Sequence, residues 1–242
     1  MTIRASDAAG SGRRELGSRA VSDEPLPPRQ RLAAMRQVYG SVGLSEADLA
    51  PTWSAMLERW LSEAEAGGIL EPNAMVVATA DADGRPNART VLLKGLDETS
   101  LTFFTNYDSA KGQELAVNPV AALLFPWVEL QRQVRLVGPV HRLDAAASDA
   151  YFASRPYGSR LSALASPQSR VLADRAQLEA ARDALAARYP EGGDVPRPEN
   201  WGGYVVVPDT VEFWQGRADR LHDRLVYRRG ADGAWVTERL AP

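Results

Sequence analysis

A stretch near the C-terminus holds the side chains whose types and spacing could do chemistry. His222 is one of only two histidines in 242 residues, and an arginine stands two positions away on each side, at Arg220 and Arg224. If residues 221–229 form a strand, its two-residue period places all three side chains on one face. Two permanent cations beside a titratable ring could receive an anionic, planar ligand. A solvated edge strand is the alternative, and the nearby rigid aromatic Trp214 favours the ligand site.

Lysine is rare in this chain, because only Lys94 and Lys111 stand among its 28 basic residues. Chance survival on the surface would explain two such residues, but a compact ammonium also suits a phosphate oxygen held in tight quarters. The residues before Lys111 predict a strand end, a turn and a helix that begins near Asp108 or Ser109. Backbone N–H groups and the helix dipole attract phosphate at such a start, although many helices begin this way.

The apolar run from Arg89 to Lys94 carries a cation at each end. Five residues apart, the two side chains lie on opposite faces of a regular strand. They could reach one anionic group only through a bulge or a bend at Gly95. The alternative is an ordinary core strand whose charged ends extend into solvent.

Further anion donors stand in the middle of the chain. Tyr151 and Arg155 are four residues apart on one face of a predicted helix, and Ser159 lies just beyond it. The trio suits a phosphate monoester, although a helix surface could carry the same residues. Gln168 and Ser169 add amide and hydroxyl donors in a loop. Several separated clusters of anion donors with aromatic residues predict a phosphorylated aromatic cofactor and substrate.

Composition narrows the class of protein. The hydrophobic fraction of 45% and the charged fraction of 24% are typical of a soluble globular protein. A net charge of -3 argues against a general nucleic-acid binder. The absence of cysteine excludes disulfides and thiolate metal sites, and two histidines leave little for a transition metal, so no metal is expected. No apolar run reaches the roughly 18 residues of a membrane span, and a cytoplasmic location without membrane attachment is expected.

The order of predicted elements indicates a small barrel. Residues 1–28 predict a disordered tail before a single domain over 29–242. An apolar stripe after Thr52 predicts a helix whose tryptophans belong to the core. Consecutive antiparallel strands with one short helical insertion predict a fold that is mainly β with peripheral helices (α+β). Strands are expected over 74–80, 87–94, 100–105, 120–125, 131–143, 203–207, 211–215, 221–229 and 234–240, and helices over 29–39, 108–118, 145–154, 159–165 and 174–189.

The motifs, in this order, resemble those of the pyridoxine/pyridoxamine 5'-phosphate oxidase family from roughly residue 36 to residue 242. The matching motifs are Arg89-Thr-Val-Leu-Leu-Lys94, Leu124-Phe-Pro-Trp127 with Arg132-Gln133, Tyr151-Phe-x-Ser-Arg-Pro156, Gln168-Ser169, Trp201-Gly-Gly203, Glu212-Phe-Trp-Gln-Gly216, Arg220-Leu-His-Asp-Arg224 and Arg239-Leu-Ala-Pro242.

The resemblance implies a homodimer of FMN-binding split β-barrels, with two flavin sites formed between the subunits. Residues from about 200 to 242 would serve dimerisation and substrate binding. The implied reaction oxidises pyridoxine or pyridoxamine 5'-phosphate to pyridoxal 5'-phosphate, with O2 as acceptor, and gives hydrogen peroxide and, from the amine, ammonia. The implied partners are a phosphorylated pyridine substrate, O2 and a second copy of the chain.

The resemblance also implies roles for individual residues. For FMN binding it implies Arg89, Lys111 and Ser169 at the phosphate, and Thr90, Val91, Leu92, Leu93, Lys94, Phe104, Thr105, Gln133, Gln168, Trp214 and Arg224 along the rest of the cofactor. For substrate binding it implies Arg36, Tyr39, Lys94, Tyr151, Arg155, Ser159, Arg220, Leu221 and His222. As catalytic residues, Arg220 would position the pyridine ring, and His222 would orient the substrate and assist proton movement.

One position departs from the family pattern. Many members carry Ser-Arg-Lys where this chain has Ser109-Ala110-Lys111, so one flavin contact is missing or is supplied from elsewhere. Three other functions fit similar residues: a flavin oxidase of phenazine biosynthesis, a non-catalytic carrier of flavin or pyridoxal phosphate, and a split barrel that uses a deazaflavin in place of FMN.

Overall fold

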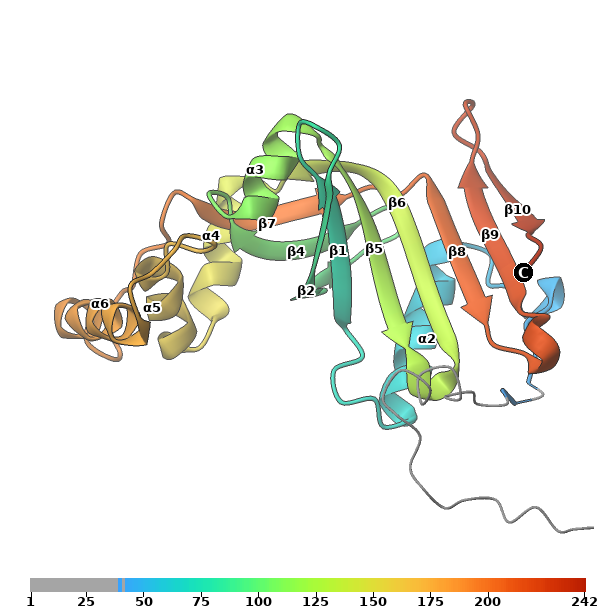
Figure 1. Cartoon of the computed structure of the whole chain (residues 1–242), viewed down its shortest axis with the longest axis horizontal. Coiled ribbons are helices and arrows are strands. Elements are labelled where there is room, and N and C mark those ends of the chain that lie inside the picture. Colours follow the sequence, from blue (N-terminus) through green and yellow to red (C-terminus); the bar gives the residue numbers. More distant parts are fainter. Residues whose placement is uncertain (1–38, 41) are drawn as a thin grey trace, which may run out of the picture. The chain divides into compact units, whose positions relative to one another are not determined.

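The computed structural model describes residues 39–40 and 42–242, which belong to one compact unit (Figure 1). The tail predicted at 1–28, the helix predicted over 29–39 apart from Tyr39, and Arg36 lie outside the described residues. Within the described part, ten strands form one curled antiparallel sheet. The predicted mainly-β barrel with peripheral helices is therefore confirmed.

The sheet has two branches that share strand β6. One branch runs in the order β10-β9-β8-β6-β5-β1-β2, and the other joins β6 to β7, β4 and β3. The strands are β1 (Ala74–Ala80), β2 (Pro86–Leu92), β3 (Gly95–Leu96), β4 (Leu101–Asn106), β5 (Val120–Trp127), β6 (Arg132–Arg142), β7 (Trp201–Val206), β8 (Thr210–Gln215), β9 (Asp223–Arg229) and β10 (Trp235–Arg239).

The hairpin predicted for β1 and β2 is confirmed. Its register pairs Ala74 with Leu92 and Ala80 with Pro86, and Gly84 takes the left-handed conformation (φ 78°) that the turn requires. Strand β2 ends at Leu92, so Lys94 leaves the strand before β3 begins. The run from Arg89 to Lys94 is therefore not one regular strand, and a break of this kind is what both charged ends would need in order to reach one anionic group.

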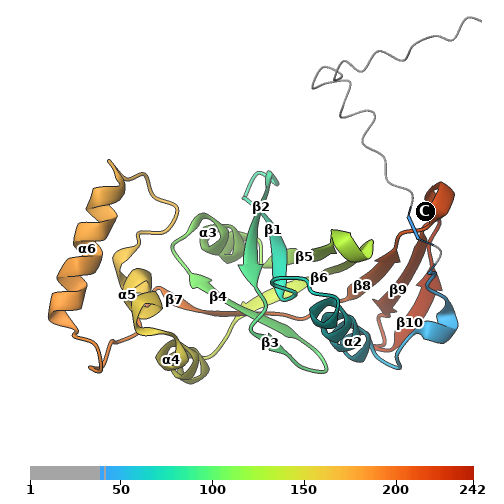
Figure 2. The same ribbon diagram turned by 90° about the horizontal axis from the view of Figure 1, so that it is seen from below.

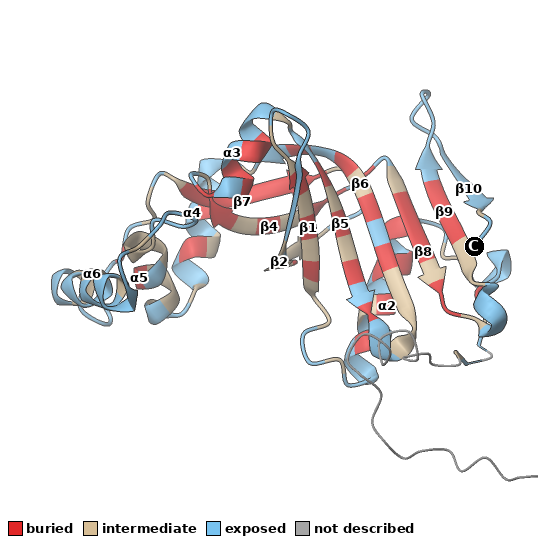
Figure 3. Ribbon diagram, viewed as in Figure 1, coloured by how far each residue is buried: buried red, intermediate tan, exposed pale blue. Residues whose placement is uncertain are grey.

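Helix α2 (Trp53–Ala66) supplies one wall of the main core. It begins at Thr52, whose hydroxyl accepts a hydrogen bond from the Ala55 N–H (3.2 Å). The helix lies against the inside of the curled sheet, and its apolar stripe is buried there (Figures 2 and 3). The Trp60 ring meets Phe213 of β8 edge-on at 5.2 Å. Burial of each such side chain contributes about 2 kcal/mol to the free energy of folding. The tryptophans are therefore core residues, as predicted.

A second group of helices lies at the other end of the sheet from β10. It contains α4 (Ala145–Ser154), α5 (Tyr157–Ala165) and α6 (Arg175–Arg188) (Figures 1 and 2). These helices share a small core of their own around Phe152, Leu161, Val195 and Trp201. The short helix α3 (Ala110–Val117) packs near β1. Among the described residues, no helix combines the length and apolar character that crossing a membrane requires.

The prediction of a strand over 221–229 was wrong at its start. Strand β9 begins at Asp223, and the residues before it form a tight turn in which Asp219 (φ 56°) and Arg220 (φ 62°) are left-handed. The chain must reverse between β8 and β9, whose last register pair joins Gln215 to Asp223. Arg220 and His222 therefore belong to the turn and do not share a strand face with Arg224.

Candidate active site

A cavity of about 310 Å³ lies where the end of β2, strand β4, α3 and α4 meet. Both lysines of the chain, Lys94 and Lys111, line it together with Arg155. Its wall, as far as the structure describes it, contains no Asp or Glu. The cavity is therefore positively charged and suits an anion. The other wall residues are Thr90, Val91, Leu92, Phe104, Thr105, Tyr151, Gln168 and Trp201.

Lys111 lies in the first turn of α3, as predicted. The helix begins at Ser109, whose hydroxyl accepts a hydrogen bond from the Gly112 N–H. The Lys111 side chain is buried, and its Nζ donates to Thr105 Oγ1 (3.1 Å), Ser109 Oγ (3.3 Å) and Gln168 Oε1 (3.0 Å). Burial lowers the pKa of Lys111, and the charge of Arg89 lowers it further. Because all three acceptors are neutral, an anion in the cavity would stabilise the ammonium.

Arg89 lies behind the cavity wall, where Glu114 of α3 holds it. Its Nη2 is 3.1 Å from Glu114 Oε2, and its Nη1 donates to Thr79 Oγ1 (2.5 Å) and to the carbonyl of Val77 (3.2 Å). The Glu114 carboxylate is buried and also accepts hydrogen bonds from Thr79 and Asn87. Arg89 is thus fixed in orientation, and its charge is felt at Lys111.

Three aromatic rings stack along the cavity beside an arginine. Phe104 stacks on Tyr151 with 3.8 Å between ring centroids, and Trp201 lies parallel to both rings at 5.5 and 6.2 Å. The Arg155 guanidinium sits 4.6 Å from the Trp201 centroid, and its buried Nη1 has no hydrogen-bond partner among the described residues. Burial lowers the pKa of Arg155 and raises that of Tyr151. A partnerless buried N–H group needs an acceptor, which a bound anion would provide.

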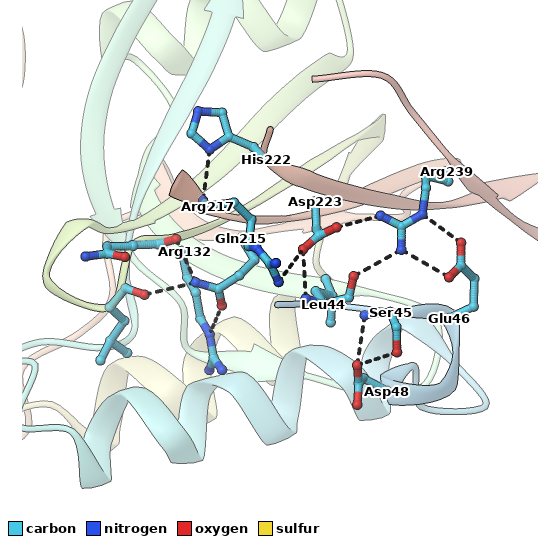
Figure 4. Close-up of polar contacts among 12 residues, drawn as sticks. Leu44, Ser45, Glu46, Asp48, Arg132, Gln215, Arg217, His222, Asp223 and Arg239 are labelled. Atoms are coloured by element: carbon cyan, nitrogen blue, oxygen red, sulfur yellow. Dashed lines mark hydrogen bonds and ion pairs between the residues drawn. The ribbon is translucent and has the colours of Figure 1, made fainter. Parts of the chain in front are cut away.

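A second cluster joins Tyr39, Trp214 and His222. The Trp214 and His222 centroids are 4.6 Å apart, and Tyr39 lies edge-on to both rings at 6.1 and 5.6 Å. Gly216 permits this approach, since a Cβ there would lie 3.1 Å from the Tyr39 ring. The Arg217 N–H donates to His222 Nδ1 at 3.1 Å (Figure 4). In the neutral ring the proton is therefore on Nε2, which is left as a donor.

Arg224 is held beside this cluster by a buried carboxylate. Its Nε donates to Glu212 Oε1 at 2.7 Å, and Arg135 binds the other carboxylate oxygen, also at 2.7 Å. Burial would raise the pKa of Glu212, but these two hydrogen bonds outweigh it and hold the pKa below its ordinary value. Arg224 pairs across the sheet with Trp214, and Trp214 pairs with Gln133, so the three lie side by side.

The predicted site residues thus fall into two groups within one chain. None of the described residues of the Tyr39, Trp214 and His222 cluster lines the cavity, and Figures 1 and 2 both place β4 and α4 away from the β8–β9 turn. Other predicted residues lie outside both groups: Leu93 is in the core, Ser159 and Ser169 do not line the cavity, and Arg220 and Leu221 are exposed.

Two residues that matter to the cavity were not predicted as site residues. In the sequence, Trp201 belongs to a family motif to which no role was assigned. In the structure its ring completes the aromatic stack with Phe104 and Tyr151. The sequence indicates even less about Glu114, because an acidic residue one helical turn after Lys111 is typical of an exposed helix surface. Its partnership with Arg89 depends on the packing of α3 against the β1–β2 hairpin, which the sequence does not display.

Together, the curled sheet and its cavity define a split-barrel protein whose largest concentration of described cationic side chains without acidic neighbours lines a cavity suited to an anion. Two family models match the chain: Pyridoxamine 5'-phosphate oxidase over residues 61–188, and Pyridoxine 5'-phosphate oxidase C-terminal dimerisation region over residues 201–242. The chain belongs to the pyridoxine/pyridoxamine 5'-phosphate oxidase family. It therefore carries the family's C-terminal dimerisation region, over residues 201–242.

Named relatives are similar over nearly the whole chain. The pyridoxine/pyridoxamine 5'-phosphate oxidase of Salinispora arenicola is 55% identical over 92% of this chain and 99% of its own length. That of Burkholderia multivorans is 56% identical over 87% of this chain and 99% of its own length. Among solved structures, PhzG from Burkholderia lata 383, in complex with tetrahydrophenazine-1-carboxylic acid, has a TM-score of 0.77 at 33% identity, over 84% of this chain and 100% of that chain.

Proposed function

We propose that this protein is an FMN-dependent oxidase that converts pyridoxine 5'-phosphate and pyridoxamine 5'-phosphate into pyridoxal 5'-phosphate. Oxygen is reduced to hydrogen peroxide, and the oxidised amine substrate takes up water and releases ammonia. The cavity carries this proposal, because it gathers both lysines of the chain and an arginine N–H that has no partner in the described part of the chain, beside three stacked aromatic rings. Such a set of donors fits phosphorylated aromatic ligands.

The donors around Lys111 fit the phosphate of FMN. We assign Arg89, Lys111 and Ser169 to that phosphate, and Thr105 and Gln168 to the neighbouring part of the cofactor. Ala110 has no side-chain donor, so the charge at this site comes from Arg89, fixed by Glu114, and from the buried Lys111 ammonium. When bound, the flavin supplies the redox chemistry, accepting hydride from the substrate C4' carbon and passing the electrons to O2.

Lys94, Tyr151, Arg155 and Ser159 are assigned to the substrate phosphate. Burial lowers the pKa of Arg155, but an arginine pKa lies so far above neutral that the guanidinium stays charged. Burial raises the pKa of Tyr151, so the phenol keeps its proton. Both groups therefore donate hydrogen bonds to an anion. Lys94 lies outside the strand and is exposed, which leaves its ammonium free to move onto the phosphate.

Arg220 and His222 are assigned to the substrate ring. With Nδ1 occupied by the Arg217 N–H, His222 presents Nε2–H toward a ligand and can hold or transfer a proton at that atom. Arg220, exposed on the turn, positions the ring by its charge. Tyr39 packs edge-on against His222 and would restrict water access from that side.

A homodimer would complete each site. The cavity and the His222 turn are separate within one chain, and the turn belongs to the region matched by the dimerisation model. We therefore assign the cavity of a site to one subunit and the turn, with Gln133, Trp214 and Arg224 as further flavin contacts, to the other. Each subunit would contribute to two sites, as twofold symmetry requires.

Anaerobic mixing of the FMN-loaded protein with pyridoxine 5'-phosphate tests the proposal. We expect loss of the oxidised flavin absorption band, followed by peroxide formation when oxygen is admitted. Absence of bleaching would refute the proposed reaction. Bleaching by a reduced phenazine precursor alone would favour the activity of phenazine biosynthesis, a yellow protein that forms no peroxide would favour a carrier, and a deazaflavin spectrum would identify a different cofactor.

A further inference from the structure

A cluster of charged residues next to His222 ties three distant parts of the chain together (Figure 4). Arg239 of β10 donates to Asp223 Oδ1 (2.6 Å), to both carboxylate oxygens of Glu46 (2.8 and 3.0 Å) and to the Leu44 carbonyl (3.1 Å). Asp223 Oδ2 in turn accepts the Leu44 N–H at 3.0 Å. We call Leu44, Glu46, Asp223 and Arg239 the clamp.

On one side the clamp holds the turn that carries Arg220 and His222. Asp223 is the first residue of β9 and follows His222 directly. Arg217 adds a second link, because its Nη1 lies 3.6 Å from Asp223 Oδ2 while its backbone N–H binds His222 Nδ1. The turn contains two consecutive left-handed residues that are not glycine, at Asp219 and Arg220. Such a backbone persists only where surrounding contacts hold it.

On the other side the clamp holds the N-terminal segment. The Leu44 N–H is bound by Asp223 and the Leu44 carbonyl by Arg239, and the Leu44 side chain is buried in the main core. A few residues earlier, Tyr39 rests on His222 and Trp214, and the Gly40 N–H donates to Gln131 Oε1 at 2.8 Å. The segment is thus anchored at Leu44 and covers the His222 ring with Tyr39.

We propose that Asp223 and Arg239 are positioning residues that hold the Arg220–His222 turn and the Tyr39 segment together and thereby set the affinity for the phosphorylated substrate. This inference rests on the proposed function. Burial would raise the pKa of Asp223, but the Leu44 N–H and Arg239 outweigh it and lower the pKa, so the clamp is charged at neutral pH.

The clamp acts on substrate binding and leaves the reacting atoms to other residues. None of its four residues lines the described part of the cavity. Releasing it would let both the turn and the Tyr39 segment occupy more conformations, and binding would then have to select the competent one. The loss falls on KM, since His222 and Arg220 can still reach the correct geometry once substrate is bound.

The test compares Asp223→Asn and Arg239→Gln with a matched control on the same hairpin. Arg228 and Glu238 also form an ion pair between β9 and β10 (3.3 Å), about half exposed, away from the turn. We expect the two clamp variants to raise KM for pyridoxine 5'-phosphate about tenfold with kcat changed less than about threefold, as for loss of a charge-assisted hydrogen bond that orders the site. FMN affinity should be unchanged, and Arg228→Gln should leave KM unchanged.

Hydrogen exchange at Leu44 provides a readout that does not depend on turnover. Its N–H donates directly to Asp223, so peptides covering residues 42–48 should exchange faster in both clamp variants and not in Arg228→Gln. Arg239→Lys keeps the positive charge but cannot bind all four acceptors, so its KM should lie between those of the wild type and Arg239→Gln. An unchanged KM, an equal rise in the control, or unchanged exchange at Leu44 would overturn the clamp. A wild-type protein without oxidase activity would instead refute the proposed function.

Discussion

Arg89 and Glu114 form an ion pair directly behind the cationic cavity, with 3.1 Å between Nη2 and Oε2. Glu114 is buried and also accepts hydrogen bonds from Thr79 and Asn87. Glu114→Ala should lower the free energy of unfolding by about 3 kcal/mol, because it leaves three donors without their acceptor. Urea denaturation of the FMN-free protein measures the loss. Inorganic phosphate should restore more stability to the variant than to the wild type, since an anion would replace the missing counter-charge; equal gains would contradict this role.

The protonation of Lys111 should control FMN affinity at alkaline pH. Burial and the charge of Arg89 lower its pKa below the ordinary 10.5, so its ammonium is lost at a lower pH than that of a free lysine. The charged form binds the phosphate, and affinity should therefore fall as pH rises through this lowered pKa. Lys111→Met should weaken FMN binding about thirtyfold at neutral pH, as for a charged hydrogen bond. Flavin fluorescence titrations measure both effects, and the variant should lack the alkaline decline seen in the wild type.

His222 should affect the reaction without affecting cofactor retention. His222→Ala removes the Nε2–H donor and the ring on which Tyr39 rests. We expect kcat/KM for pyridoxine 5'-phosphate to fall by at least about a hundredfold, a typical contribution of a positioned proton donor, while the FMN content of the purified protein stays the same. Steady-state peroxide assays measure the change. Undiminished kcat/KM would remove His222 from the mechanism.

Acid should release the clamp through Glu46. Its hydrogen bond from Arg239 lowers its pKa from 4.5 to about 2. A carboxylate whose folded pKa is depressed stabilises the folded state above its unfolded pKa, and this contribution disappears as pH falls through the folded value. The Tm difference between the wild type and Glu46→Gln should therefore be constant above about pH 5 and shrink toward pH 2. A difference that does not depend on pH in this window would contradict the assigned pKa.

Local sequence patterns predicted most of the fold, because most of its helices and turns depend on residues that are close together in the chain. The apolar stripe from Trp53 to Leu61, the β1–β2 hairpin and the Ser109 start of α3 are all short-range features. The strand expected from residue 221 failed for the opposite reason. Where β9 begins depends on its register with β8 and on two left-handed residues in the turn, neither of which a two-residue period reveals.

The sequence predicted which residues belong to the candidate site better than it predicted how they are arranged in space. Lys94 and Lys111 were singled out by their rarity, and the structure brings them to one cavity. His222 was singled out by its flanking arginines, yet it lies in a different cluster from both lysines. The contact of Glu114 with Arg89 and that of Arg239 with Glu46 could not be predicted. The two residues of the first pair are 25 positions apart in the chain, and those of the second pair are 193 positions apart.

The division of the site between two subunits predicts that two variants, each with little activity when FMN is limiting, complement each other under that condition. Lys111→Met damages the cavity, and His222→Ala damages the turn. If a site takes its cavity from one subunit and its turn from the other, a heterodimer of the two variants has one intact site and one doubly damaged site. Co-expression with random pairing makes about half of the dimers mixed, so activity should return to about a quarter of the wild-type value. Tagging the two variants differently and purifying the mixed dimer should raise this to about half. Activity in the mixed dimer no higher than in the separate variants would place each site within a single chain.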